Sequence, residues 1–416
     1  MADAADDELA AIAHLIAGGD DQAGYAQLAA RIGWPRGKDL AELSPWIGVL
    51  ATLAERRGAP QLAQLAREVV RDPDSPDRLY ELGYALIDAN ASAIAASVLW
   101  RCMQLVGDSE QVVCELVSAL ETHLAHADAF ELLESREALR AESFMCRYLH
   151  AFDAAMTGRL DVTRAVLPTL AGDDTDDDHL VMIGAIRAIV ERADRVAGAC
   201  QLDAGDLRGW HYVITGGLLA HQSPYGWPAP MRGRYAWLHD SIARVATGLD
   251  RLGPLAAAAG APCVYAPPGR DHEIVAQAAA RRLGLPLMPW PTIGVPAPGI
   301  VALYDLAALP GDLAKLVARR DGQILYAHAA PWTRDCAIAP DVTTLLYQHL
   351  VPPWDDVRPI EAIADDIAAS AGSTSDDLAA DEPARWDALV SRAWPPAPGQ
   401  RSRAWAGGPV RSNRFE

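Results

Sequence analysis

The chain has 416 residues and a formal net charge of −19 at pH 7, and half of its residues are hydrophobic. This length exceeds one ordinary domain, so we expect two or three domains with sizeable cores. No apolar run approaches the roughly 18 uncharged residues that a membrane span requires. The acidic start, MADAADDELA, also lacks the pattern of a signal peptide. These features exclude an integral membrane protein and predict a soluble one.

The charge is unevenly distributed along the chain. Residues 1–208 carry 35 acidic and 18 basic residues, whereas residues 209–416 carry 20 and 18. An acidic surface repels phosphate backbones, so we expect no nucleic-acid binding; a basic protein or peptide partner fits it better. Alternatively, the acidity only keeps the first half soluble. Six cysteines without metal-like spacing favour a reducing cytoplasm. The excess of Arg over Lys indicates a bacterial source.

Apolar residues recur at helical spacing from about residue 6 to residue 198. The clearest unit is DRLYELGYALIDANASAIAASVLWRCMQLVG, residues 77–107. Its first helix carries Leu79, Leu82, Gly83 and Leu86, and its second carries Leu99. A similar pattern follows about 34 residues later, which predicts a repeat of helical hairpins.

This spacing resembles the tetratricopeptide repeat over roughly residues 45–200, although Leu79 and Leu86 stand where that family usually has Trp and Tyr. The resemblance implies a superhelix whose concave side binds peptides or proteins. An irregular stack of helical hairpins would give nearly the same pattern. Either interpretation predicts N-terminal helices or a cap over residues 1–44 and a helical array over residues 45–208.

The stretch from 209 to 254 is expected to join two domains. It is rich in His, Trp and Gly up to residue 240 and then predicts a helix over 235–252. Its aromatic rings either hold two domains together or close over a site. In the second case it would supply His211, His221, Arg234 and His239.

Residues 255–355 predict a small α/β domain with a mostly parallel sheet. Strands are expected at 261–266, 285–290, 300–306 and 323–328, and helices at 271–283 and 312–320. Short helices follow in 356–395. The Pro-, Gly- and Arg-rich tail, 396–416, is predicted to be disordered.

Polar residues follow the strands of the predicted sheet, where ligands of such sheets bind. Arg270, Asp271 and His272 open the helix after the first strand, and that helix N-terminus with Arg270 favours an anion. Asp271 serves equally well as an ordinary helix cap. Later segments contribute Asp305, His328 and Arg334. We expect these groups to share one edge.

Two functions remain open from the sequence. One is a cytoplasmic scaffold that binds a protein partner through its helical array and carries an assembly or ligand-sensing α/β module. The other is an enzyme acting on an anionic small molecule such as a nucleotide or sugar phosphate. Arg270 and Arg334 would then hold the anion, while His328 or His272 acts as acid or base with Asp305. Dinucleotide, P-loop, serine-esterase and zinc-protease motifs are missing, and no cofactor is indicated.

Overall fold

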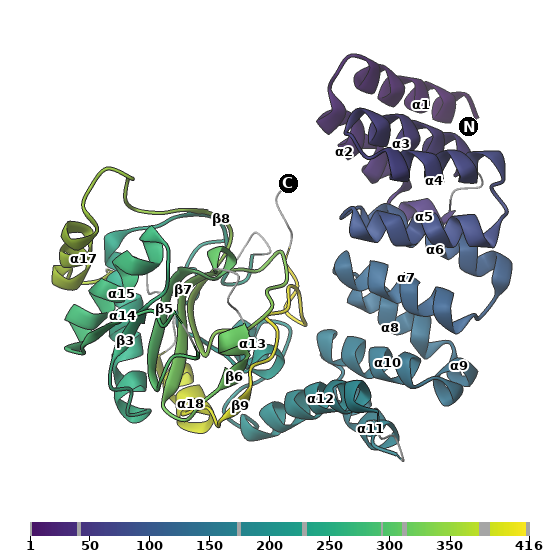
Figure 1. Ribbon diagram of the computed structural model, residues 1–416. Helices are drawn as coiled ribbons and strands as arrows, with labels where there is room; N and C mark the ends of the chain where they lie inside the picture. The colour runs from purple at the N-terminus through teal and green to yellow at the C-terminus, as the bar shows by residue number, and fades with distance from the viewer. Residues whose placement is uncertain are drawn as a thin grey trace. The chain divides into compact units, whose positions relative to one another are not determined.

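The computed structural model describes residues 2–39, 43–172, 176–226, 231–292, 294–309, 314–373 and 383–412. The chain forms two compact units, coloured by residue number in Figure 1. One comprises Met1–Ala154 and Pro168–Gly172, and the other Ala155–Leu167 and Asp173–Glu416. The division therefore falls near residues 155–172 and not near the expected junction at 209.

The first unit is a succession of helices. They are α1 (Ala2–Ala17), α2 (Asp21–Ile32), the 3₁₀ helix η1 (Arg36–Asp39), α3 (Ser44–Arg56), α4 (Pro60–Arg71), α5 (Pro76–Asp88), α6 (Ser92–Val106), α7 (Glu110–Thr122), α8 (His126–Glu134), α9 (Glu137–Glu142), most of α10 (Phe144–Met156) and the end of α11 (Leu160–Leu170), whose earlier residues belong to the second unit. Neighbours in sequence pack together, α3 on α4, α5 on α6 and α6 on α7 (Figure 1). The predicted helical array is confirmed. No helix in the described part of the chain is both long and apolar enough for a membrane span.

The expected register of the clearest hairpin also holds. Leu79, Leu82 and Leu86 are buried on α5, and Leu99 is buried on α6. Gly83 lies where these two helices approach most closely: a Cβ atom added to it would stand 2.5 Å from Leu99 Cγ. The glycine therefore provides the space that Leu99 fills.

A parallel sheet forms the centre of the second unit and confirms the expected α/β domain. Its strand order is β1-β8-β7-β5-β3-β4. Strand β1 pairs with the start of β8, and β2 pairs with the end of β8. Every pairing in this sheet is parallel (Figure 1). The strands are β1 (Leu218–Leu219), β2 (Tyr235–His239), β3 (Val264–Ala266), β4 (Leu287–Pro289), β5 (Gly299–Asp305), β7 (Gln323–Pro331) and β8 (Val342–Val351).

The helices of this unit are α12 (Asp177–Arg195), α13 (Leu207–Thr215), α14 (Ile242–Ala258), α15 (Arg270–Leu283), the 3₁₀ helix η2 (Leu306–Ala308), α16 (Ala314–Val317), α17 (Ile360–Ala369) and α18 (Pro383–Ala393). Two expected helices are corrected. Part of 235–252 is strand β2, because residues 235–239 pair with β8, and α14 begins only at Ile242. Of 312–320, only α16 is helical within the described residues. Strand β8, which lies between β7 and the short strands β1 and β2, was not predicted at all.

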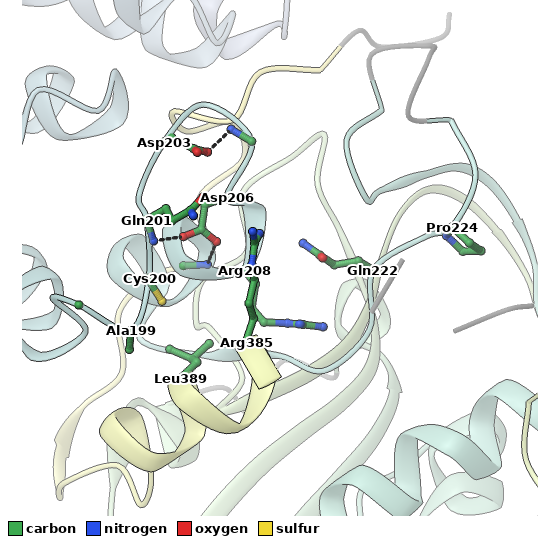
Figure 2. Close-up of a pocket in the computed structure, with 13 residues that line it drawn as sticks. Ala199, Cys200, Gln201, Asp203, Asp206, Arg208, Gln222, Pro224, Arg385 and Leu389 are labelled. Carbon is green, nitrogen blue, oxygen red and sulfur yellow. Dashed lines mark hydrogen bonds between the residues drawn. The ribbon is translucent and has the colours of Figure 1, made fainter. Parts of the chain in front are cut away.

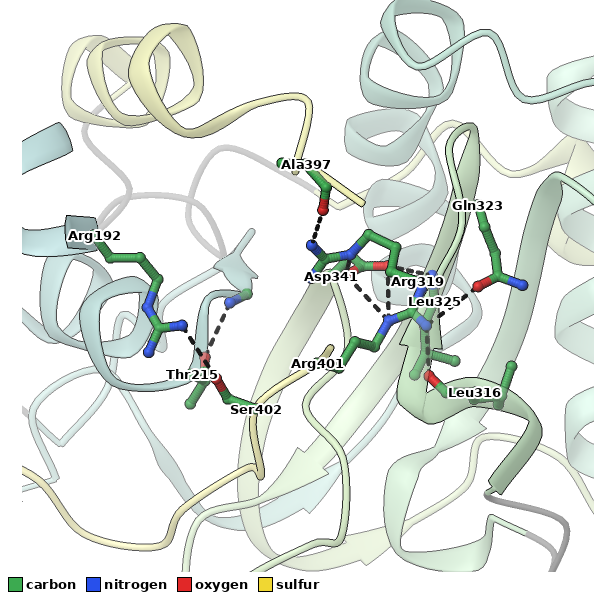
Figure 3. A network of polar contacts seen from close by, with 11 residues as sticks. Arg192, Thr215, Leu316, Arg319, Gln323, Leu325, Asp341, Ala397, Arg401 and Ser402 are labelled. Atoms are coloured by element: carbon green, nitrogen blue, oxygen red, sulfur yellow. Dashed lines mark hydrogen bonds and ion pairs between the residues drawn. The ribbon is translucent and has the colours of Figure 1, made fainter. Parts of the chain in front are cut away.

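The prediction of a disordered tail is wrong for the residues described, which extend to 412. Strand β9 (Gly399–Gln400) pairs antiparallel with β6 (Ala318–Arg319). The next residue, Arg401, donates to Asp341 Oδ2 over 2.7 Å and to the Leu316 carbonyl over 2.6 Å. Arg319 donates to the other oxygen of Asp341 over 2.8 Å (Figure 3). This buried charge network fastens the tail to the start of β8.

Candidate functional site

A cavity of about 460 Å³ lies at the carboxyl edge of the sheet. Its walls come from the start of α15, the end of β5 and the end of β8 with the loop behind it. The polar side chains that line it are Arg270, Asp271, His272, Tyr304, Asp305, Tyr347, Gln348, His349 and Asp356. This is the edge at which open parallel sheets bind ligands.

The start of α15 is shaped by Gly269. Its φ of +126° strains any residue with a side chain, and an added Cβ would also lie 3.1 Å from the His272 ring. Immediately after it, Arg270 donates to the carbonyls of Asp355 and Arg358, over 3.0 and 2.6 Å. Arg270 therefore holds the loop after β8 in place and forms one wall of the cavity.

Two carboxylates of the cavity, those of Asp305 and Asp271, accept hydrogen bonds that join its walls. Asp305 Oδ1 accepts a 2.6 Å hydrogen bond from the Tyr347 hydroxyl and a 2.9 Å bond from the Ala307 amide. Burial, and then the charge of Asp305, raises the pKa of Tyr347, so this phenol stays protonated and donates. On the other side, Asp271 Oδ1 accepts from Trp354 Nε1 over 2.7 Å.

A buried hydrogen-bonded chain lies below Tyr304. Asp240 Oδ2 is 3.0 Å from both His328 Nε2 and the Tyr304 hydroxyl, and the side chains of Asp240 and His328 have no exposed surface. Tyr326 continues the chain, 3.5 Å from His328 Nδ1. Burial first, and the Asp240 charge next, raises the pKa of Tyr304. Tyr304 thus remains a donor whose ring lines the cavity.

His272 is tied to the backbone through both ring nitrogens. Its Nδ1 accepts from the Tyr304 amide over 3.2 Å, and its Nε2 lies 3.2 Å from the Ala308 carbonyl. Burial lowers the pKa of His272, with the nearby carbonyl and carboxylates acting in the opposite direction. A neutral ring that accepts at Nδ1 and donates at Nε2 matches both partners. The geometry assigns His272 a positioning role for α15 and β5.

The charges around the cavity favour a cation over an anion. Three carboxylates, Asp271, Asp305 and Asp356, line it, against the single guanidinium of Arg270. That guanidinium is already directed to two backbone carbonyls. The contacts therefore do not support the expected anion site, and an amine or hydroxyl-rich ligand is the better match.

The remaining expected site residues lie elsewhere. His211 and Arg234 line a separate narrow cavity of about 40 Å³ beside tail residues such as Val410. The His221 ring is buried, with Nε2 3.1 Å from the Tyr235 hydroxyl. His239 is exposed and lines a third cavity. The 209–240 stretch therefore reaches the sheet edge through Asp240, and these His and Arg side chains do not close over the site.

Arg334 is exposed and does not line the cavity, although its positive charge acts to lower the pKa of Tyr347. Asp240, Tyr304 and Tyr347 were missed from the sequence. Signals for two of them exist: Asp240 is the sole acid in 209–240, and Tyr304 immediately precedes Asp305 in an apolar strand.

A larger cavity of about 940 Å³ lies in the same unit, between the loop before α13 and helix α18 (Figure 2). Two of its charged side chains, those of Asp206 and Arg208, form hydrogen bonds with the backbone. Asp206 accepts from the amides of Gln201, Leu202 and Gly209, and Arg208 donates to the Leu219 carbonyl over 2.8 Å. These contacts shape the loop, so the sheet-edge cavity remains the stronger candidate.

Comparison with models of protein families, with curated proteins and with solved structures finds no match for this chain.

Proposed function

We propose that the protein is a cytoplasmic interaction scaffold whose tetratricopeptide-like array binds a basic, peptide-like segment of a partner protein. The observation that carries the proposal is an exposed acidic face on α5. Asp77, Glu81, Tyr84 and Asp88 recur at helical spacing on this helix and are all exposed. Tyr84 retains 51% of its surface.

The acidic face continues onto the next repeat. The pKa of Glu115 on α7 is raised, first by burial and then by the charge of Asp88, so these two carboxylates are close enough to repel each other. Within the described residues, none of Asp77, Glu81, Asp88 and Glu115 forms an ion pair. A Lys or Arg side chain would relieve this repulsion, and the Tyr84 ring offers a face for a cation.

The test is a charge-reversal comparison with basic partner peptides. Glu81→Lys, Asp88→Lys and Glu115→Lys are combined, and the control combines Glu131→Lys, Glu137→Lys and Glu142→Lys, which changes the net charge equally on α8 and α9. Fluorescence anisotropy with a Lys/Arg-rich peptide library should show about threefold to 100-fold weakening only in the first variant, since three rim pairs contribute about 0.2–1 kcal/mol each. Equal weakening in both would mean that net charge alone attracts the peptides.

The cavity at the sheet edge favours a second role, as a binding site for a small amine or hydroxyl-rich molecule. We infer binding and not catalysis, because His328 and Asp240 lie beneath Tyr304 with no exposed side-chain surface. Thermal-shift measurements with polyamines and polyols test this inference. Stabilisation should disappear in Asp305→Asn and persist in Asp387→Asn, which removes one exposed charge from α18. Stabilisation by phosphate esters alone would instead restore the anion hypothesis.

The six cysteines are all free thiols in the structure, two of them with sulfur atoms 3.7 Å apart. Such usage supports the proposed reducing location.

A further inference from the structure

Three side chains with metal-binding atoms converge inside the helical array. They are Glu121 in the last turn of α7, His126 at the start of α8 and Asp153 on α10, three helices of the first unit (Figure 1). One ligand atom from each lies within 4.8 Å of the others. His126 Nδ1 and Asp153 Oδ1 are 2.8 Å apart.

These distances match the space around a small cation. Zinc binds imidazole nitrogen and carboxylate oxygen at about 2.0–2.2 Å, so two ligand atoms on a tetrahedral ion lie about 3.4 Å apart. The His126–Asp153 pair is hydrogen-bonded at 2.8 Å and would move apart by about 0.6 Å to take up an ion, while no separation among the three ligand atoms exceeds 4.8 Å. One nitrogen and two oxygens also form a donor set that suits zinc or manganese better than calcium.

The surroundings indicate what an ion would contribute. The Asp153 side chain has no exposed surface and that of His126 is 8% exposed. Removing two carboxylates from water is costly, and a divalent cation would balance both charges. The Phe152 ring packs edge-on against His126, with centroids 6.0 Å apart, which restrains the imidazole orientation. A neighbouring pair, His150 with Glu134, has only one carboxylate and one imidazole and provides a comparison within the same array.

We propose that Glu121, His126 and Asp153 bind one divalent transition-metal ion, with Zn²⁺ as the best match, and that this ion ties α7, α8 and α10 together. Water would complete the coordination. Because the three ligands come from three different helices, α7, α8 and α10, occupancy would couple neighbouring hairpins of the array. This site is separate from the acidic face on α5 and from the sheet-edge cavity, and its existence does not depend on either proposed binding role.

The direct test is titration of the EDTA-treated full-length chain with Zn²⁺ or Mn²⁺ by isothermal calorimetry. We expect one ion per chain. Glu121→Gln, His126→Gln and Asp153→Asn should each weaken binding by about 100-fold or more, since each removes a direct ligand. Two controls should bind as the parent does: Glu134→Gln, which alters the comparison pair, and Cys114→Ser, which removes a thiol that could hold Zn²⁺ nearby. Circular dichroism verifies that each variant is folded.

A second measurement avoids variants altogether. Hydrogen exchange of the parent chain should slow on Zn²⁺ addition in α7, α8 and α10 and stay unchanged in α1–α4. Three results would overturn the proposal: no Zn²⁺ or Mn²⁺ binding by the parent, protection located in other helices, or folded Glu121→Gln and Asp153→Asn variants that bind normally.

Discussion

Gly83 offers the sharpest test of how the array is packed. Replacing it by Ala puts a Cβ atom 2.5 and 2.6 Å from two carbon atoms of the buried Leu99 side chain. Overpacking of this kind costs about 1–3 kcal/mol. Removing a glycine from a helix interior returns about 1 kcal/mol. The net free energy of unfolding should therefore fall by up to about 2 kcal/mol, and further in Gly83→Leu.

A matched variant separates the two effects. Gly48 is also helical and lies in the same unit, but an added Cβ there meets only Val70 Cγ2, at an ordinary 3.9 Å. Gly48→Ala should consequently stabilise the array by about 1 kcal/mol. The difference between the two alanine variants then measures the steric cost alone, and urea unfolding followed by circular dichroism provides both values.

The pair of residues can also be tested together. Leu99→Ala by itself should cost about 2–5 kcal/mol by opening a cavity. Combined with Gly83→Ala it should cost less than the sum, because the shortened side chain no longer meets the new methyl group. If Gly83→Ala proves as stabilising as Gly48→Ala, the close approach of α5 and α6 is refuted.

Three further outcomes are expected. Arg401→Met should lower the free energy of unfolding of the second unit by about 3–5 kcal/mol, because it removes one buried partner of Asp341. Arg403→Met, at a half-exposed side chain, should change this free energy by less than about 1 kcal/mol. Urea unfolding measures both. Burial and then Arg234 lower the pKa of His211 to about 4, whereas the unfolded side chain titrates near its ordinary 6.5. The unfolded state therefore takes up the proton first as the pH falls. Up to about 3 kcal/mol of stability, fully present above pH 6.5, should be lost by pH 4. His211→Gln should flatten this pH profile, and His239→Gln, at an exposed histidine, should not. Finally, diamide should join Cys114 to Cys146, 3.7 Å apart, with loss of two hydrogens per chain by mass spectrometry. The pKa of Cys146 is lowered to about 7 by the hydrogen bond from Cys114, so the reaction should accelerate between pH 6 and 8, and a cross-link that persists in Cys146→Ser would contradict this pairing.

Local patterns in the sequence were sufficient wherever a single element buries one face. The spacing of Leu79, Leu82 and Leu86 predicts the buried side of α5, and Gly83 marks the close approach, because helical periodicity depends only on neighbours along the chain. The alternation of strands and helices between 261 and 328 likewise predicts parallel pairing. Parallel pairing in turn predicts that Asp271 and Asp305 lie at the same edge of the sheet, where the strands end.

The tertiary structure decided features that depend on distant partners. Residues 235–239 have no local preference strong enough to exclude a helix, and only pairing with β8 makes them a strand that delivers Asp240 to His328 and Tyr304. The tail has the composition of a disordered segment. It is nevertheless held in place by the buried ion pair between Arg401 and Asp341, which are 60 residues apart. Average composition cannot reveal such a contact. The ion pair is stabilising because the fold has already buried the Asp341 carboxylate, which then needs a charged partner.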